Sequence, residues 1–248
     1  MECTDSTAVA TFFAAEPLVV GGTVTLSDEA AHHIRVARVA VGDCIALRDG
    51  AGRAALGTLV KVSRSSALVD VSETSEIPRP AMIHLLAPVA DRERMLWLAE
   101  KVVELGVTSW RPVIWRRSKS VSPRGEGPTF QAKVLARMTS ALIQSGGGWL
   151  PDMFPEATVE RAISAAPLGT RLLLTQDGEP IAGVPMHIPI TIALGPEGGM
   201  EPAERDLFIG AAFLPVKLGS GTLRFETAGM AAVAIAAASQ VTSRQSNV

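Results

Sequence analysis

Two glycine-rich turns are the parts of this sequence best suited to binding a ligand. The first lies in ALGPEGGMEPAE (residues 193–204) and the second in VKLGSGTLRFETAGM (residues 216–230). Each follows an apolar segment and precedes one with helical periodicity. Glycine leaves room beside the backbone, so N–H and C=O groups can reach a ligand that a Cβ would exclude. One such turn alone is more often a tight strand–helix connection, but a second one favours a binding site.

Neither turn matches a motif that cradles nucleotide phosphates. The second turn has Arg224 where G-x-G-x-x-G needs its last glycine, and G-x-x-x-x-G-K-[ST] does not occur in the chain. A ligand held by backbone groups and an apolar wall fits the residues better. Adenosine with a thioether or sulfonium tail is such a ligand.

Arg224 and Glu226 are the charged residues closest to the second turn. They flank Phe225 just before the last helical segment. One interpretation is a surface charge and a residue of the helix's first turn, where an acid is stabilised. The other is a functional pair, in which Arg224 stabilises negative charge on a substrate base and Glu226 orients it. The four histidines and two cysteines have no metal-ligand spacing, so no metal site is predicted.

The elements that must position these turns fall into two regions. Residues 1–75 contain short segments of β type separated by Gly and Asp turns, with a single helix near residues 27–37 that Ser27 caps. This pattern predicts a small β-barrel. Its expected strands are residues 16–20, 23–26, 43–49, 54–63 and 66–72.

A polar, proline-containing linker at residues 75–81 separates this region from an alternation of strands and helices over residues 81–248. Such alternation predicts an α/β domain with a largely parallel sheet. The expected strands are residues 82–89, 107–115, 171–176, 189–194 and 213–218, and the expected helices are 91–106, 129–145, 202–211 and 226–240.

Composition indicates a soluble globular protein. The 248 residues are 47% hydrophobic and 19% charged. The most apolar run, residues 228–238, is shorter than the roughly 20 residues that a membrane helix needs. The N-terminus has no basic stretch, so no signal peptide is predicted. With only Cys3 and Cys44, no disulfide scaffold is expected, and a reducing cytoplasm fits best.

The net charge of −2 conceals an uneven distribution. Residues 1–75 hold six Lys and Arg against nine Asp and Glu, whereas residues 91–137 hold ten against five. The basic segment RPVIWRRSKSVSPRG (residues 111–125) also has one tryptophan, Trp115, and the small residues of a loop. Charge alone leaves two interpretations equally open, a solvated surface or an RNA contact.

These motifs together resemble the SPOUT methyltransferases, and most closely the RsmE type, which methylates N3 of a uridine in 16S ribosomal RNA. The similarity runs nearly end to end. Its motifs, in chain order, are HHIRVARVAVGDCIALRDGAG (32–52), RMLWLAEKVVELGV (94–107) with Lys101 and Glu104, WRRS (115–118), IQSGGGWLP (143–151), LGPEGG (194–199) and LGSGTLRFETA (218–228).

The resemblance implies an N-terminal PUA-like, RNA-binding β-barrel (1–75) and a SPOUT α/β domain (81–248) with a C-terminal trefoil knot. It also implies a homodimer and S-adenosylmethionine as cofactor. The alanine and glycine surface of the helix at 226–240 suits close helix packing, so this helix is the expected dimer interface. The implied cofactor residues are Leu174, Gln176, Leu194, Gly195, Pro196, Glu197, Gly198, Gly199, Leu218, Gly219, Leu223, Arg224 and Thr227. Arg224 and Glu226 are the catalytic candidates, and Arg35, Arg38, Arg116, Arg117 and Lys119 the RNA-binding candidates.

Three positions depart from the family pattern. Thr11 stands where arginine is usual, Gly147 lies where another arginine is expected, and Gly221 replaces a bulky, often basic residue. Lost arginines remove contacts to phosphate. Two alternatives therefore stay open beside 16S rRNA uracil-N3 methylation: a catalytically silent RNA-binding protein with this fold, and a methyltransferase with a different RNA target.

Overall fold

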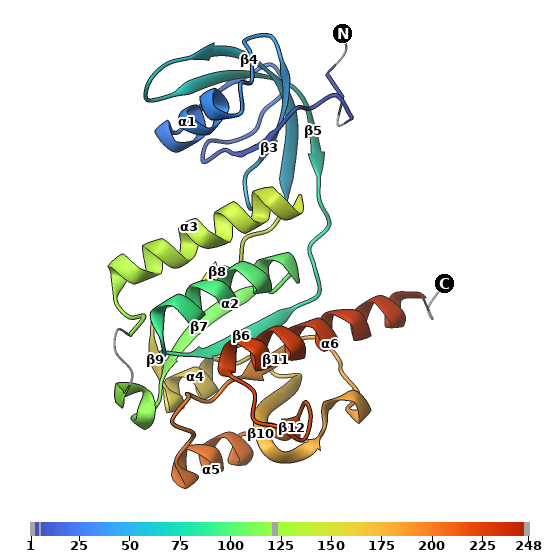
Figure 1. Cartoon of the computed structure of the whole chain (residues 1–248). Coiled ribbons are helices and arrows are strands. Elements are labelled where there is room, and N and C mark those ends of the chain that lie inside the picture. Colours follow the sequence, from blue (N-terminus) through green and yellow to red (C-terminus); the bar gives the residue numbers. More distant parts are fainter. Residues whose placement is uncertain (1–2, 5, 121–123, 246–248) are drawn as a thin grey trace. The chain divides into compact units, whose positions relative to one another are not determined.

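The computed structural model describes residues 3–4, 6–120 and 124–245, and Figure 1 traces the chain. The chain divides into two compact units. The N-terminal unit comprises Met1–Arg79 together with Thr139–Leu150, and the C-terminal unit comprises Pro80–Met138 and Pro151–Val248. The segment at 139–150, which lies far along the chain, therefore belongs to the first unit.

The N-terminal unit is built on a five-stranded sheet with the order β1-β3-β4-β5-β2. Its elements are β1 (Thr11–Phe13), β2 (Thr23–Leu26), α1 (Asp28–Val36), β3 (Cys44–Arg48), β4 (Arg53–Val62) and β5 (Ala67–Glu76). All pairings are antiparallel except that of β1 with β3. The Ser27 side chain accepts a hydrogen bond from the backbone of Ala30 and caps α1, as predicted.

One strand prediction in this unit is wrong. Residues 16–20 form no strand, and the first strand of the sheet is β1 (Thr11–Phe13), which was not predicted. In the segment 16–20 Leu18 is fully buried in the core, but Val19 and Val20 are both exposed. Gly22 donates its N–H to the carbonyl of Val19, so this apolar run is a tight turn with one anchoring side chain.

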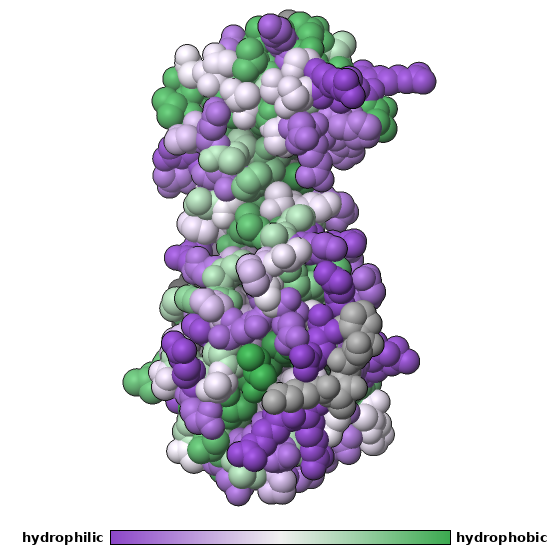
Figure 2. All heavy atoms as spheres, turned by 90° about the vertical axis from the view of Figure 1, so that its left-hand side faces the viewer, coloured by the Kyte–Doolittle hydropathy of each residue, from purple (hydrophilic) through white to green (hydrophobic). Residues whose placement is uncertain are grey.

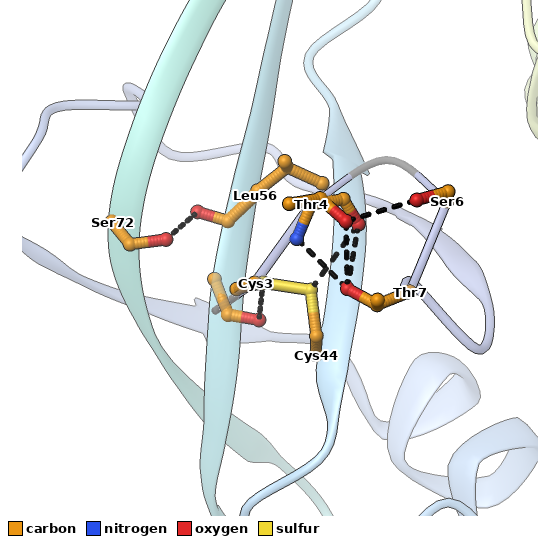
Figure 3. The surroundings of a disulfide bond; sticks show 8 residues. Cys3, Thr4, Ser6, Thr7, Cys44, Leu56 and Ser72 are labelled. Atoms are coloured by element: carbon orange, nitrogen blue, oxygen red, sulfur yellow. Dashed lines mark hydrogen bonds between the residues drawn. A yellow bond between two sulfur atoms is a disulfide. The ribbon is translucent and has the colours of Figure 1, made fainter. Parts of the chain in front are cut away.

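The two cysteines form a disulfide, which corrects the expectation drawn from their small number (Figure 3). Their Cα atoms lie 5.3 Å apart, although 41 positions separate them in sequence. The N-terminal segment runs beside β3, which explains the proximity of the two cysteines. Val9 donates its N–H to the carbonyl of Cys44, the first residue of β3. The N-terminal segment is thus covalently attached to the sheet, and the cysteine count is no argument for a reducing compartment.

The C-terminal unit has a parallel sheet in the order β12-β10-β11-β6-β7-β8, with β9 also paired to β7. Its strands are β6 (Ile83–Pro88), β7 (Ser109–Ile114), β8 (Asp152–Met153), β9 (Ala157–Thr158), β10 (Thr170–Pro180), β11 (Ile190–Ala193) and β12 (Leu214–Lys217). Its helices are α2 (Arg92–Glu104), η1 (Arg116–Ser120), α4 (Val159–Ala165), η2 (Ile181–Gly183), α5 (Pro202–Gly210) and α6 (Phe225–Gln245), while α3 (Pro128–Ser145) runs from this unit into the other.

Helices pack on this sheet in two groups (Figure 1). Side chains of α4 and α5 share a buried cluster with the strands, in which Trp115 stacks on Phe208 with 5.2 Å between ring centroids. Helix α6 instead packs on α2 and contacts β6 and β11. Gly229 allows this close approach, because a Cβ there would lie 2.8 Å from a methyl carbon of Leu194.

Among the described residues, no helix is long and apolar enough to cross a membrane. On the face drawn in Figure 2, hydrophilic residues predominate and smaller hydrophobic areas lie among them.

Candidate functional site

The two glycine turns line one cavity of about 910 Å³ in the C-terminal unit. The first turn follows β11 and the second follows β12, so both lie at carboxyl ends of parallel strands, where open α/β sheets bind ligands. A third wall comes from the middle of β10. Its pairing with β12 is interrupted between Leu174 and Glu179, and Thr175, Gln176 and Asp177 in that interruption line the cavity.

Eleven of the thirteen predicted cofactor residues line this cavity. They are Leu174, Gln176, Leu194, Gly195, Pro196, Glu197, Gly199, Leu218, Gly219, Leu223 and Arg224. Gly198 and Thr227 do not line it. The lining residues absent from the prediction are Asp91, Arg94, Thr175, Asp177, Met200, Arg205, Val216, Lys217, Gly221, Thr222, Phe225 and Ala228.

The first turn is held from several sides. Gly199 has a φ of +75°, a conformation that favours glycine, and donates its N–H to the carbonyl of Pro196. A Cβ on Gly195 would lie 3.0 Å from the Met200 side chain. Glu197 forms an ion pair with Arg94 at the start of α2. The carbonyl of Gly198 accepts a hydrogen bond of 3.1 Å from Arg117.

The second turn is open by comparison. A Cβ on Gly219 or on Gly221 would meet no atom within 4 Å, and neither glycine has a positive φ. One side-chain hydrogen bond reaches across to it: the Gln176 amide donates to the Thr222 hydroxyl over 2.9 Å. Since no contact with the described residues requires glycine there, the open space beside this turn suits a ligand that comes close to the backbone.

The two catalytic candidates have different surroundings. Arg224 is exposed and lines the cavity. Glu226 is buried in the first turn of α6 and is not part of the cavity wall. Its Oε1 lies 3.9 Å from Nε of Arg94, and its Oε2 is buried without a hydrogen-bond partner in the described part of the chain. Glu226 therefore lies beside the cavity rather than in its wall.

Arg116 and Arg117 of the basic segment (residues 111–125) lie close to the first turn. Glu204, a buried residue of α5, accepts a hydrogen bond of 2.8 Å from the backbone N–H of Arg116 and one of 2.9 Å from that of Glu201. Arg116 also lies 3.6 Å from the Glu201 carboxylate. Arg116 and Arg117 therefore adjoin the cavity wall, while the side chain of Lys119 lies outside the described part of the structure.

Arg35 and Arg38 belong to the N-terminal unit and are exposed. Arg35 is on α1 and donates to the carbonyl of Ser63. Arg38 follows α1 with a φ of 56°. Both positions are open to solvent, as a contact to phosphate requires.

The Lys101–Glu104 pair of the sequence motif forms an ion pair of 2.8 Å on α2, outside the cavity. Hydrogen bonds to Glu100 and Glu104 raise the pKa of Lys101, and the bond from Lys101 lowers the pKa of Glu100. This cluster is a charged surface of the helix. No group of three or more potential metal ligands occurs among the described residues.

The departures from the family pattern have distinct structural contexts. Thr11 is the first residue of β1. A Cβ on Gly147 would lie 3.2 Å from a methyl carbon of Leu142, so a larger side chain there requires a small adjustment. Gly221 faces open space at the cavity. Of the three, only Gly221 bears on the cavity itself.

Family models match both parts of the chain. Residues 77–237 match an RNA methyltransferase domain, and residues 26–72 match an RNA methyltransferase PUA domain. A curated relative, ribosomal RNA small subunit methyltransferase E of Synechocystis sp., is 31% identical over 228 residues, which is 87% of this chain and 73% of the relative.

Solved structures of RNA methyltransferases are also similar to this chain. Ribosomal RNA small subunit methyltransferase E of Neisseria gonorrhoeae, bound to S-adenosylmethionine, superposes with a TM-score of 0.80 at 31% identity, covering 94% of this chain and 97% of its own. A protein of Legionella pneumophila in complex with the same cofactor gives a TM-score of 0.84 at 25% identity, covering 92% and 97%. This chain therefore belongs to the family of RNA methyltransferases with a PUA domain that includes ribosomal RNA small subunit methyltransferase E.

Proposed function

We propose that this protein transfers a methyl group from S-adenosylmethionine to N3 of a uridine in the 16S RNA of the small ribosomal subunit. The observation that carries the proposal is that both glycine turns line the same cavity. The second turn also has open space beside Gly219 and Gly221. The Synechocystis and Neisseria relatives, both named for methylation of small-subunit ribosomal RNA, support the choice of substrate.

The residues present fit the cofactor. Backbone groups of Gly195 and Gly219 are accessible from the cavity, and Leu174, Leu194 and Leu223 supply apolar wall. An adenosine needs both kinds of surface, so we assign these residues to its binding. When bound, S-adenosylmethionine supplies an electrophilic methyl group on a sulfonium sulfur.

Arg224 is the residue best placed to act on the substrate base, because it is a cation on the cavity wall and open to solvent. Uridine N3 must lose its proton before it can act as a nucleophile. In this proposal Arg224 stabilises the negative charge that then spreads to the uracil carbonyls. The cavity walls place N3 in line with the methyl group. Since Glu226 is buried behind the wall, the proton is released to water.

The target uridine must be unstacked to reach the cavity, which favours a single-stranded segment of ribosomal RNA. Arg116 and Arg117 adjoin the first turn and would bind phosphates next to the target. Arg35 and Arg38 would bind RNA at the N-terminal unit. We further propose, from the family resemblance, that the protein is a cytoplasmic homodimer and that the chain forms a trefoil knot around the two turns. Helix α6 is the proposed dimer interface, because its small side chains suit close packing.

Nucleoside analysis of ribosomal RNA tests the proposal. Small subunits from cells that lack the N3-methyl mark would be incubated with the purified protein and S-adenosylmethionine, digested to nucleosides and separated by mass spectrometry. The expected product is N3-methyluridine from 16S RNA. Methylation at another atom or at another position of the ribosomal RNA would indicate a different target, and an absence of any methylated product would favour an RNA-binding protein without catalytic activity.

A further inference from the structure

Arg94, the third residue of α2, lies between the two glycine turns. Its guanidinium forms an ion pair with Glu197 of the first turn. Its Nε lies 3.9 Å from Oε1 of Glu226, the second residue of α6, which begins directly after the second turn. The backbone N–H of Arg94 is itself fixed by a hydrogen bond of 3.1 Å to the Asp91 carboxylate, the N-cap of α2. One side chain therefore connects α2 to the first glycine turn and to the start of α6.

The burial of Glu226 gives this connection its importance. The Glu226 side chain is only 11% exposed, and its Oε2 has no hydrogen-bond partner in the described part of the chain. A buried carboxylate is costly unless a cation lies close to it. Arg94 is the cation nearest to it among the ion pairs of the described residues. Without Arg94, the Glu226 carboxylate would lose its nearest ion-pair partner and move toward solvent, and the start of α6 would move with it.

We propose that Arg94 is a positioning residue for the cofactor cavity, which fixes the first glycine turn through Glu197 and the start of α6 through Glu226. The inference rests on the proposed function in one respect: S-adenosylmethionine occupies the cavity between the turns. Arg94 acts by holding both turns at the separation that the cofactor needs. Lysine at this position would keep one ion pair but cannot present two separated N–H groups to both carboxylates.

Calorimetric titration with S-adenosylmethionine tests this role separately from catalysis. The variants are Arg94→Gln, Arg94→Lys, Glu226→Gln and the double variant Arg94→Gln/Glu226→Gln. The matched control is Arg137→Gln, because Arg137 forms an ion pair with Glu100 in the same unit but does not line the cavity. Thermal unfolding of each variant measures stability alongside affinity.

We expect Arg94→Gln to raise the dissociation constant by about tenfold, with partial recovery in Arg94→Lys and no change in Arg137→Gln. The double variant should bind more tightly than the sum of the single effects predicts, because removing the Glu226 charge removes the need for its cation. Additive effects, or equal affinity of folded Arg94→Gln and wild type, would overturn the inference.

Two further outcomes are also decisive. If Arg94→Gln does not fold, Glu226→Gln and Arg94→Lys replace it, and unchanged affinity in both would overturn the positioning role. If the wild-type protein itself binds no S-adenosylmethionine, both the proposed function and this inference fail. Binding by the wild type together with unaffected variants removes the inference alone.

Discussion

The two glycine turns have similar sequences but different structural reasons for their glycines. In the first turn, glycine serves the fold: Gly199 has a positive φ, and Gly195 packs closely on Met200. In the second turn, Gly219 and Gly221 have ordinary backbone angles and open space around them. The first turn is also tied to its neighbours by Arg94 and Arg117, whereas a single side-chain hydrogen bond reaches the second from β10.

This difference indicates that the two turns have different roles in ligand binding. A turn held by ion pairs and close packing offers its backbone groups at fixed positions, so it pre-organises one side of the site. A turn whose glycines face open space offers room, and its glycines are explained by what binds there. Substitutions should therefore affect stability and affinity together at the first turn, and affinity alone at the second.

The largest effect is expected for Gly195→Val. Valine would press on Met200 and extend into the cavity from a turn that cannot move aside. We expect affinity for S-adenosylmethionine to fall by about 100-fold, or ~3 kcal/mol, with a measurable loss of stability. Calorimetry and thermal unfolding measure the two effects. Full affinity in this variant would show that the first turn does not contact the cofactor.

Gly219→Val should separate affinity from stability. No atom lies within 4 Å of the added Cβ, so the unfolding temperature should stay close to that of wild type. Affinity for the cofactor should still fall, by about tenfold, because the side chain occupies the ligand's space. Gly183→Val is the matched control, since Gly183 also faces open space but does not line the cavity. Equal affinity of Gly219→Val and the control would contradict the role given to the second turn.

Arg117→Gln tests how far the first turn depends on its basic neighbour. The family resemblance implies that Arg117 binds RNA rather than the cofactor. Its hydrogen bond to the Gly198 carbonyl alters that expectation. We now expect cofactor affinity to fall by about threefold, as for loss of one partly exposed hydrogen bond, in addition to weaker RNA binding. Arg161→Gln, an exposed arginine of α4 away from the cavity, should leave cofactor affinity unchanged.

The smallest expected effect is on the stability of the protein at acid pH. Asp177, on the β10 wall, forms an ion pair of 2.8 Å with Arg205 of α5, the helix that follows the first turn. The hydrogen bond from Arg205 lowers the pKa of Asp177 below the ordinary value of an aspartate side chain. The resulting stability is present above that value and is lost as the pH falls through the lowered pKa.

Asp177→Asn should accordingly lower the unfolding temperature slightly at pH 6 and converge with wild type in strong acid. The effect is small because the Asp177 side chain is 61% exposed and solvent screens the pair. Thermal unfolding between about pH 2 and pH 6 measures this. A difference that grows toward acid would contradict the assignment.

The sequence predicts the cavity well where neighbouring residues in the chain form it. Glycine turns after apolar strands lie together because carboxyl ends of parallel strands meet at one edge of the sheet. The walls formed by distant residues were not predicted. Arg94 comes from a helix about a hundred positions earlier. Glu204 of α5 accepts a hydrogen bond from the backbone N–H of Arg116, which is far away in the chain. A signal for Arg94 did exist, because Asp91 and Arg94 follow the strand β6, which pairs with β11.

Short elements were missed for a related reason. Strands β8 and β9 have two residues each and α4 has seven, so none has enough length for a periodic pattern. The disulfide was missed because no sequence pattern places residue 3 next to residue 44. Only the pairing of the N-terminal segment with β3 brings their Cα atoms to 5.3 Å. Interactions between distant segments, rather than local propensity, determine these features.

A crystal structure with S-adenosylhomocysteine, the demethylated cofactor, tests the central claim most directly. We predict electron density for the ligand between the turns at 195–199 and 218–224, with the adenosine against Leu174 and Leu194 and the backbone of Gly219 in direct contact. Ligand density elsewhere on the molecule, or saturating ligand with an unchanged cavity and no density, would contradict the assignment of the cofactor site to the two glycine turns.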